Sequence, residues 1–229
     1  MIRKLKRIFI GLILLNITYL IFLKFYFPFI NITMLVTFVS GNGLTKENIT
    51  FAEAGKNMPL AIISSEDQNF ATHYGFDFEA IQDAIEDYGD STKVLRGGST
   101  LSQQTAKNVF LWQGRDWIRK AIEVPETFLI EWIWGKKRIL EIYLNIAETG
   151  KGFFGVEAAA KHYFQKSAKE LSVSEAAWIA TILPNPKKLD IKKPTRKMIR
   201  KHNWIMKQMQ NLRSNKEIVL LLESEKITK

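Results

Sequence analysis

The 229-residue sequence predicts a mostly α-helical protein with one N-terminal transmembrane helix. Three observations support this fold class. A long uncharged apolar run follows a basic N-terminus, apolar residues farther along recur at the 3.6-residue period of helices, and no segment shows the sustained alternation expected of half-buried strands. Because 46% of the residues are hydrophobic, the chain can bury one substantial core besides the anchor.

The anchor is predicted from the uncharged run 8–23, which four cations precede. This run is shorter than the ~20 residues that a spanning helix needs. Lys24 can extend its ammonium to the headgroups and the aromatic residues after it can lie at the interface, so we expect the span at 8–29. The basic segment 1–7 then lies in the cytoplasm and everything after residue 30 outside.

A cleaved signal peptide is the alternative to an anchor. It requires a small-x-small cleavage site, whereas bulky aromatic residues and Pro28 follow the apolar run. The next segment, 30–57, begins with the strongly apolar residues 30–39. These residues could belong to the core or form a surface that lies on lipid.

Caps and periodicity predict the helices of the outer domain. Pro59 suits the first turn of one helix, and Asp77 can cap the next. Residues 139–147 place an apolar stripe on one helix face, and Ser172 with Glu175 forms a capping box at the start of a further helix. A methionine and isoleucine stripe at 198–209 predicts core packing or membrane contact rather than a cofactor site.

The positive charge is concentrated at the two ends of the chain. Residues 185–229 carry thirteen Lys or Arg against four Asp or Glu, and residues 1–24 carry five Lys or Arg and no acid. Basic ends favour contact with anionic lipid or a phosphorylated substrate. Nucleic acid is the rival partner, but no helix-turn-helix, zinc-finger or aromatic RNA-binding signature accompanies the charge. Without cysteine, a disulfide framework and a thiolate zinc site are excluded.

Three segments carry candidate chemistry. In the first, Glu66 and Asp67 follow an apolar stretch, where a carboxylate can be tuned to act as a general base. The competing interpretation is a solvated helix end capped by acids.

The second segment, 96–108, is a loop of small and polar residues that runs into a helix and so offers free backbone N–H groups to an anion. Lys107 lies on the helix face of Gln103, and Arg115 and Arg119 follow. A phosphate-bearing ligand fits this pattern. The glycine spacing and the Gly-Lys-Ser/Thr ending of a Walker motif are absent, which argues against use of a nucleoside triphosphate.

The third segment places Glu123 beside Arg119 and Lys120. An ion pair with Arg119, four residues earlier, is the structural interpretation, and a catalytic carboxylate is the functional one.

These segments stand in the order found in glycosyltransferase family 51, and the sequence most closely resembles its monofunctional biosynthetic peptidoglycan transglycosylases. The motifs are Glu66-Asp-x-x-Phe-x-x-His73-x-Gly-Phe-Asp77, Gly97-Gly-Ser-Thr-x-Ser-Gln-Gln-x-Ala-Lys-Asn108, Arg119-Lys-x-x-Glu123, Lys137-Arg-Ile-Leu-Glu-x-Tyr-Leu-Asn145, Gly152-x-x-Gly155-Val-Glu-Ala-Ala-Ala160 and Leu183-Pro-Asn-Pro186.

The resemblance implies a lysozyme-like catalytic core at 58–186, followed by a basic helical segment at 187–229. It implies that lipid II is polymerised into β-1,4-linked glycan strands, with inversion at MurNAc C1 and release of undecaprenyl diphosphate. By the same resemblance the catalytic residues are Glu66, the general base toward the GlcNAc 4-hydroxyl, and Glu123. The substrate-binding residues that it implies are Asp67, Phe70, Gly98, Ser99, Thr100, Gln103, Gln104, Lys107, Arg115, Arg119 and Lys120.

The resemblance also implies a divalent metal, Mg²⁺ or Mn²⁺, and no organic cofactor. The expected partners are lipid II, the growing glycan strand, membrane lipids and other cell-wall synthesis proteins, with no nucleic acid. The expected location is the bacterial cytoplasmic (inner) membrane, crossed once, with the catalytic domain on the periplasmic side. A lysozyme-like muramidase or lytic transglycosylase and a non-catalytic membrane scaffold are the alternative functions.

Four positions depart from the family pattern. Pro125 is expected to kink or interrupt the helix that carries Glu123. Glu126 adds a charge, Gly135 loosens the start of the next helix, and Thr149 stands where an aromatic residue is common. Because a diphosphate leaving group needs cations whereas a sugar leaving group needs a protonated acid, the many cations favour transfer over hydrolysis.

Overall fold

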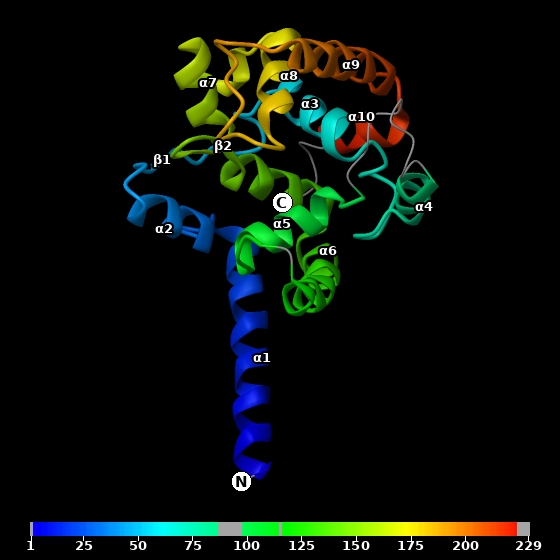
Figure 1. The fold of residues 1–229 in the computed structure, drawn as a ribbon. Coiled ribbons are helices and arrows are strands. Elements are labelled where there is room, and N and C mark those ends of the chain that lie inside the picture. Colours follow the sequence, from blue (N-terminus) through cyan, green and yellow to red (C-terminus); the bar gives the residue numbers. More distant parts are fainter. Residues whose placement is uncertain (1, 87–97, 115, 224–229) are drawn as a thin grey trace.

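The computed structural model describes residues 2–86, 98–114 and 116–223. It confirms the predicted fold class, because helices make up most of the chain. Figure 1 shows helix α1 (Ile2–Phe25) as a stem below a helical body, with the N-terminus at its far end.

Helix α1 is long and apolar enough to cross a membrane, and most of its side chains are exposed. It ends at Phe25, so the last residues of the predicted span, 26–29, lie outside the helix. Its C-terminal end is docked on the body, where Leu20 and Leu23 are fully buried. Trp134 Nε1 donates to the carbonyl of Leu20 at 2.8 Å, and Arg138 Nη2 donates to that of Leu23 at 2.9 Å.

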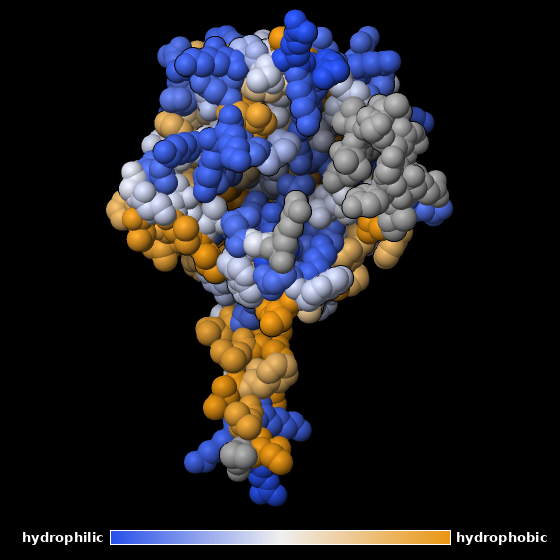
Figure 2. Space-filling model, in the orientation of Figure 1, coloured by the Kyte–Doolittle hydropathy of each residue, from blue (hydrophilic) through white to orange (hydrophobic). Residues whose placement is uncertain are grey.

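Helix α2 (Ile32–Val39) divides the apolar segment 30–39 between buried and exposed positions. Met34 is fully buried in the core, whereas Val36 and Val39 are exposed. The core interpretation is therefore confirmed for part of the segment, and a surface that lies on lipid stays a prediction for the exposed part. Figure 2 shows hydrophobic surface on the stem and on the lower part of the body, with hydrophilic surface above.

Helices α3 (Asn57–Glu66), α8 (Val173–Ile182) and α9 (Arg196–Leu212) pack on one another in the part of the body that lies away from the stem (Figure 1). The capping box of Ser172 at the start of α8 is confirmed. The stripe of α9 buries Met198, Ile205 and Met209, and α10 (Lys216–Glu223) adds Ile218. Because α9 and α10 share the main hydrophobic cluster, the expected boundary at residue 186 does not divide the core.

Helix α5 (Leu101–Phe110) packs along α6 (Trp117–Ile146), and α4 (Phe78–Glu86) precedes them with Asp77 as its cap. The expectation of an interruption at Pro125 is wrong, because α6 continues through it with helical backbone angles. Proline leaves the carbonyl of Ala121 without its helix hydrogen bond, and both residues are exposed. The kink lies at Gly135 (φ 72°, ψ 169°), in agreement with the loosened helix start expected there.

A small sheet that the sequence did not predict lies beside α7 (Val156–Phe164). It consists of β1 (Thr45–Lys46), β2 (Glu148–Gly150) and β3 (Phe153–Phe154) in the order β1-β3-β2, and the short 3₁₀ helix η1 (Ala168–Glu170) follows α7. Asn145, at the end of α6, makes a further contact with the segment around β1: its side chain accepts from Ile49 N and donates to Ile49 O, each at 2.8 Å. These two hydrogen bonds join Ile49, in the segment that follows the anchor, to the C-terminal end of α6.

Candidate active site

Glu66 is the last residue of α3, and its carboxylate lies at an accessible edge of the body. Oε1 accepts from Ser65 Oγ at 2.9 Å and Oε2 accepts from Gln104 Nε2 at 3.2 Å. Lys201 Nζ lies 3.9 Å from Oε1, and the Glu66 side chain is 14% exposed. A carboxylate held by two neutral donors yet reachable from outside suits a general base.

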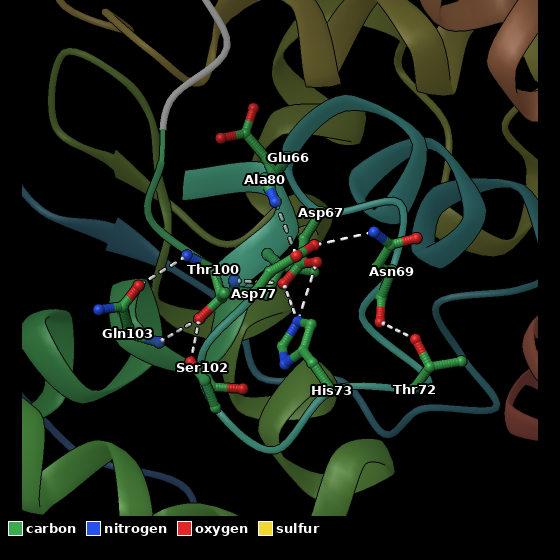
Figure 3. Close-up of polar contacts among 12 residues, drawn as sticks. Glu66, Asp67, Asn69, Thr72, His73, Asp77, Ala80, Thr100, Ser102 and Gln103 are labelled. Atoms are coloured by element: carbon green, nitrogen blue, oxygen red, sulfur yellow. Dashed lines mark hydrogen bonds and ion pairs between the residues drawn. The ribbon is translucent and has the colours of Figure 1, made fainter. Parts of the chain in front are cut away.

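Asp67, the next residue, points the opposite way (Figure 3). Both of its oxygens lie 3.0 Å from His73 Nε2, and Oδ2 also accepts from Leu101 N at 2.8 Å. Its side chain is 2% exposed. Asp67 therefore joins the end of α3 to the first residue of α5, and its implied role in substrate binding stays a prediction.

The start of α5 is fixed by a second set of buried contacts. Thr100 and Gln103 form a reciprocal capping box, and Thr100 Oγ1 donates to Gly75 O at 2.6 Å. Both side chains are buried, and Phe70 is fully buried. These three residues shape the wall of the site from behind, and a direct contact of their side chains with substrate stays a prediction. Gly98 and Ser99 are exposed.

Gln104 and Lys107, one turn farther along α5, do face the site. Gln104 Oε1 accepts from Tyr143 OH at 3.2 Å, so the Gln104 amide links Tyr143 to Glu66. Burial raises the pKa of Tyr143 well above its usual value, and the charge of Glu66 adds to this effect. Burial lowers the pKa of Lys107, while Glu123 opposes that shift.

Glu123 lies in a cluster of cations at the start of α6. One oxygen accepts from Arg119 Nη1 at 2.5 Å and the other from Lys120 Nζ at 2.6 Å, and the Glu123 side chain is 4% exposed. Asp116 caps the helix through the backbone N–H of Arg119 at 2.8 Å. The expected ion pair with Arg119 is confirmed, and Lys120 joins it. Arg115 lies outside the described residues.

A pocket of about 300 Å³ opens beside this cluster. Its walls come from α2, α5, the end of α6 and the turn after α8; the lining residues include Thr33, Gln104, Lys107, Asn108, Gln113, Tyr143, Ile146, Glu148, Phe154, Leu183 and Lys187. Lys187 Nζ lies 3.4 Å from Glu148 Oε1 on one wall, and burial raises the pKa of Glu148. The pocket is thus lined by Lys107 together with apolar side chains such as Ile146, Phe154 and Leu183.

Comparison with known proteins decides the family. The family model described as Transglycosylase matches residues 33–210, which is most of the chain. The chain belongs to the transglycosylase family. This confirms the resemblance drawn from the motifs, and the match includes α9 within the domain.

Curated relatives agree with this assignment. Biosynthetic peptidoglycan transglycosylases from Haemophilus influenzae, Pasteurella multocida and Yersinia pseudotuberculosis are 56%, 53% and 54% identical to this chain over 171, 161 and 160 residues. These alignments cover 75%, 70% and 70% of this chain, and 68%, 65% and 66% of the relatives. The aligned part is thus about two thirds of each relative's length.

The structure of this transglycosylase brings together part of the predicted site and adds to it. Glu66, Gln104 and Lys107 surround one open region, with Arg119, Lys120 and Glu123 beside it. Sequence reasoning missed Tyr143, Glu148, Lys187 and Lys201. Tyr143 stood in the expected apolar stripe of 139–147 and in the motif that ends at Asn145, and its hydroxyl set it apart from the stripe.

The described residues do not fit a metal held by the protein alone. They contain no group of three or more His, Asp or Glu that could hold an ion. Glu123, the carboxylate nearest the cations, already accepts from Arg119 and Lys120. Mg²⁺ usually takes one or two carboxylates together with substrate phosphates. The expected Mg²⁺ or Mn²⁺ therefore remains a prediction.

Proposed function

We propose that this transglycosylase polymerises lipid II into β-1,4-linked glycan strands, with Glu66 as the general base. The observation that carries the proposal is the position of Glu66: its partly exposed carboxylate accepts from Gln104, which lines the pocket together with Lys107. The family acts in peptidoglycan synthesis, and these residues match its motifs.

In the proposed reaction, Glu66 accepts the proton of the acceptor's GlcNAc 4-hydroxyl while that oxygen bonds to C1 of the donor MurNAc. The bond from C1 to the diphosphate oxygen breaks at the same time, and its electron pair leaves with undecaprenyl diphosphate. Attack from the side opposite the leaving group inverts C1 and gives the β-1,4 link. The GlcNAc-bearing acceptor must therefore approach from the side of Glu66.

The departing diphosphate gains negative charge, which Lys107, Arg119 and Lys120 are placed to neutralise. Prearranged cations in a partly buried site stabilise such charge more than water does. Glu123 accepts hydrogen bonds from two of these cations and so keeps their positions fixed. The cations in turn hold both of its oxygens, so Glu123 is not free to protonate a sugar leaving group. A muramidase or lytic enzyme would have to use Glu66 or Glu148 as its protonated acid.

We also propose that the site works at the surface of the bacterial cytoplasmic membrane, with the N-terminus in the cytoplasm and the body on the periplasmic side. The support is the basic flank of α1 and a set of exposed apolar side chains on the first half of α6 and on α2. These side chains are Trp117, Ile118, Ile122, Phe128, Trp132, Leu35, Val36, Phe38 and Val39. Membrane lipids and other cell-wall synthesis proteins remain proposed partners.

The test is incubation of the detergent-solubilised full chain with labelled lipid II, followed by gel separation and muramidase digestion. We expect wild type to give a muramidase-sensitive ladder and Glu66→Gln to lose at least about 100-fold in rate, since a positioned base contributes roughly 10²–10⁴-fold. Glu217→Gln, a change of an exposed acid on α10, is the matched control and should retain activity. Absence of polymer with wild type would favour the scaffold, and shortening of preformed strands would favour the lytic enzyme.

A further inference from the structure

Lys201 comes from a part of the chain that no catalytic motif includes, yet its ammonium approaches the general base. It lies on α9, and its Nζ is 3.9 Å from Glu66 Oε1. Its side chain is 28% exposed, so the charge is partly removed from water. Burial lowers the pKa of Lys201, and the charge of Glu66 acts in the opposite direction.

The packing of α9 fixes where Lys201 lies. The adjacent His202 stacks on Trp178 of α8 with ring centroids 4.2 Å apart and an angle of 18°, and its Nε2 lies 3.1 Å from Ser174 Oγ. Met198 and Ile205, on the same helix, are buried in the core. Lys201 is therefore carried by a rigid element, and its distance from Glu66 does not depend on a surface loop.

The other groups that face Glu66 come from three directions. Ser65, which also donates to the carbonyl of Ala180 on α8, and Gln104 from α5 are neutral donors to its carboxylate. Lys107 on α5 and Tyr143 on α6 interact with its charge at longer range. Lys201 is the cation within 4 Å of the carboxylate among the described residues.

We propose that Lys201 is a positioning residue for the general base, which keeps the Glu66 carboxylate ionised and turned toward the acceptor side of the site. This inference rests on the proposed function. A nearby cation favours the ionised form of a carboxylate, so it keeps the base usable at lower pH. The same cation makes the carboxylate a weaker proton acceptor, so it slows proton transfer once every molecule is ionised.

These two effects predict a change in the pH dependence of kcat that structural damage would not produce. In Lys201→Met, the acid limb of the pH dependence of kcat should move up by about one pH unit, the size expected for a partly exposed charge about 4 Å away. The variant should therefore be up to about tenfold slower at acid pH and equal to or faster than wild type at alkaline pH. Lys201→Arg keeps the charge and should restore the wild-type profile.

The experiment measures polymerisation of labelled lipid II between about pH 5 and pH 9 for wild type, Lys201→Met, Lys201→Gln, Lys201→Arg and Lys207→Met. Lys207 lies on the same helix, is exposed and carries the same charge, so its loss should leave the acid limb unchanged. Thermal unfolding of each variant over the same pH range identifies any variant that fails to fold, and Lys201→Gln provides a polar replacement if the methionine is not tolerated.

The possible outcomes separate the two proposals. If wild type makes no polymer, the proposed function fails before Lys201 is tested. If wild type makes polymer and the Met and Gln variants keep its acid limb, the positioning role is overturned. A rise in KM at every pH with an unchanged limb would also overturn it, because that pattern indicates direct contact with the acceptor. The positioning role would be supported if the pH profiles of Lys201→Met and Lys201→Gln cross the wild-type profile while Lys201→Arg follows it.

Discussion

Replacing Asp67 with alanine should destabilise the protein far more than replacing its neighbour Glu66. The Asp67 carboxylate accepts from His73 Nε2 at 3.0 Å and from Leu101 N at 2.8 Å, in a site where its side chain is 2% exposed. Alanine would leave two buried donors without an acceptor, at about 1–3 kcal/mol each. We therefore expect Asp67→Ala to lower the free energy of unfolding by about 3 kcal/mol.

The amide variant Asp67→Asn should have an intermediate effect. Its side chain keeps one acceptor for Leu101 N but turns an N–H toward His73, where the wild-type carboxylate accepts. The other ring nitrogen of His73 lies 3.4 Å from Lys136 Nζ, a donor, so a change of tautomer would only move the conflict to that side. We expect a loss of about 1–2 kcal/mol.

Thermal unfolding of the full chain in mild detergent, followed by tryptophan fluorescence, measures these differences. For a chain of this size, about 3 kcal/mol corresponds to a fall in Tm of roughly 6–12 °C. Glu66→Gln is the matched control, because Glu66 lies at the edge and should change Tm by no more than about 2 °C while abolishing polymerisation. An unchanged Tm in Asp67→Ala, or a larger fall in Glu66→Gln, would refute the assignment of structural and catalytic roles.

Three further predictions concern α6 and the pocket. Gly135→Ala should lower stability by about 1 kcal/mol because φ is 72° there, and Pro125→Ala should raise it by about 1–3 kcal/mol because alanine restores the hydrogen bond to the Ala121 carbonyl. Denaturant unfolding would show both changes, and opposite signs would contradict the fold. Asn16→Leu removes the 3.0 Å hydrogen bond to Glu126 and should lower Tm by a few degrees. Thr18→Val, at an exposed position of the same helix, is the control. Equal Tm values for the two variants would mean that the contact with Glu126 contributes nothing to stability. Burial raises the pKa of Glu148 above its value in the unfolded chain, so wild type should lose stability as pH rises through the interval between these two values. Glu148→Gln should lack this loss, and parallel curves of stability against pH for the two proteins would count against it.

The sequence was sufficient for features that depend on neighbours along the chain. The caps at Asp77 and Ser172 act within one helical turn, and the stripe at 139–147 follows from the helix period. The three strands have two or three residues each, so they are too short to show a period and were not predicted. Their pairing also depends on a contact between distant segments, because residues 45–46 pair in parallel with residues 153–154.

The effect of Pro125 shows a second limit. Proline removes one hydrogen bond from any helix interior, but it does not always end the helix. Here Ala121 is exposed, and the helix continues. Gly135 bends it instead, because its backbone has adopted a positive φ. The sequence names both residues without deciding between them.

The motif residues show a third limit of sequence reasoning, which concerns the direction of each side chain. Family motifs identified Asp67, Thr100 and Gln103 with the site, but a motif does not tell which side chains point into the site and which hold its walls. Lys201 and Tyr143 were missed for the opposite reason: both reach the site through packing of helices distant in sequence from Glu66. Direction and long-range proximity both require the folded structure.

The hydrogen bonds from Trp134 and Arg138 to the carbonyls of Leu20, Leu23 and Tyr26 have a consequence for how the protein meets its substrate. They fix the axis of α1 relative to α6, the same helix that carries Arg119 and Lys120. In a bilayer, the protein would then diffuse as one rigid body whose cations stay at a constant height and tilt above the lipid. A lipid-linked sugar arriving by lateral diffusion is confined to that plane too, so the search for a productive encounter is reduced to two translations and one rotation.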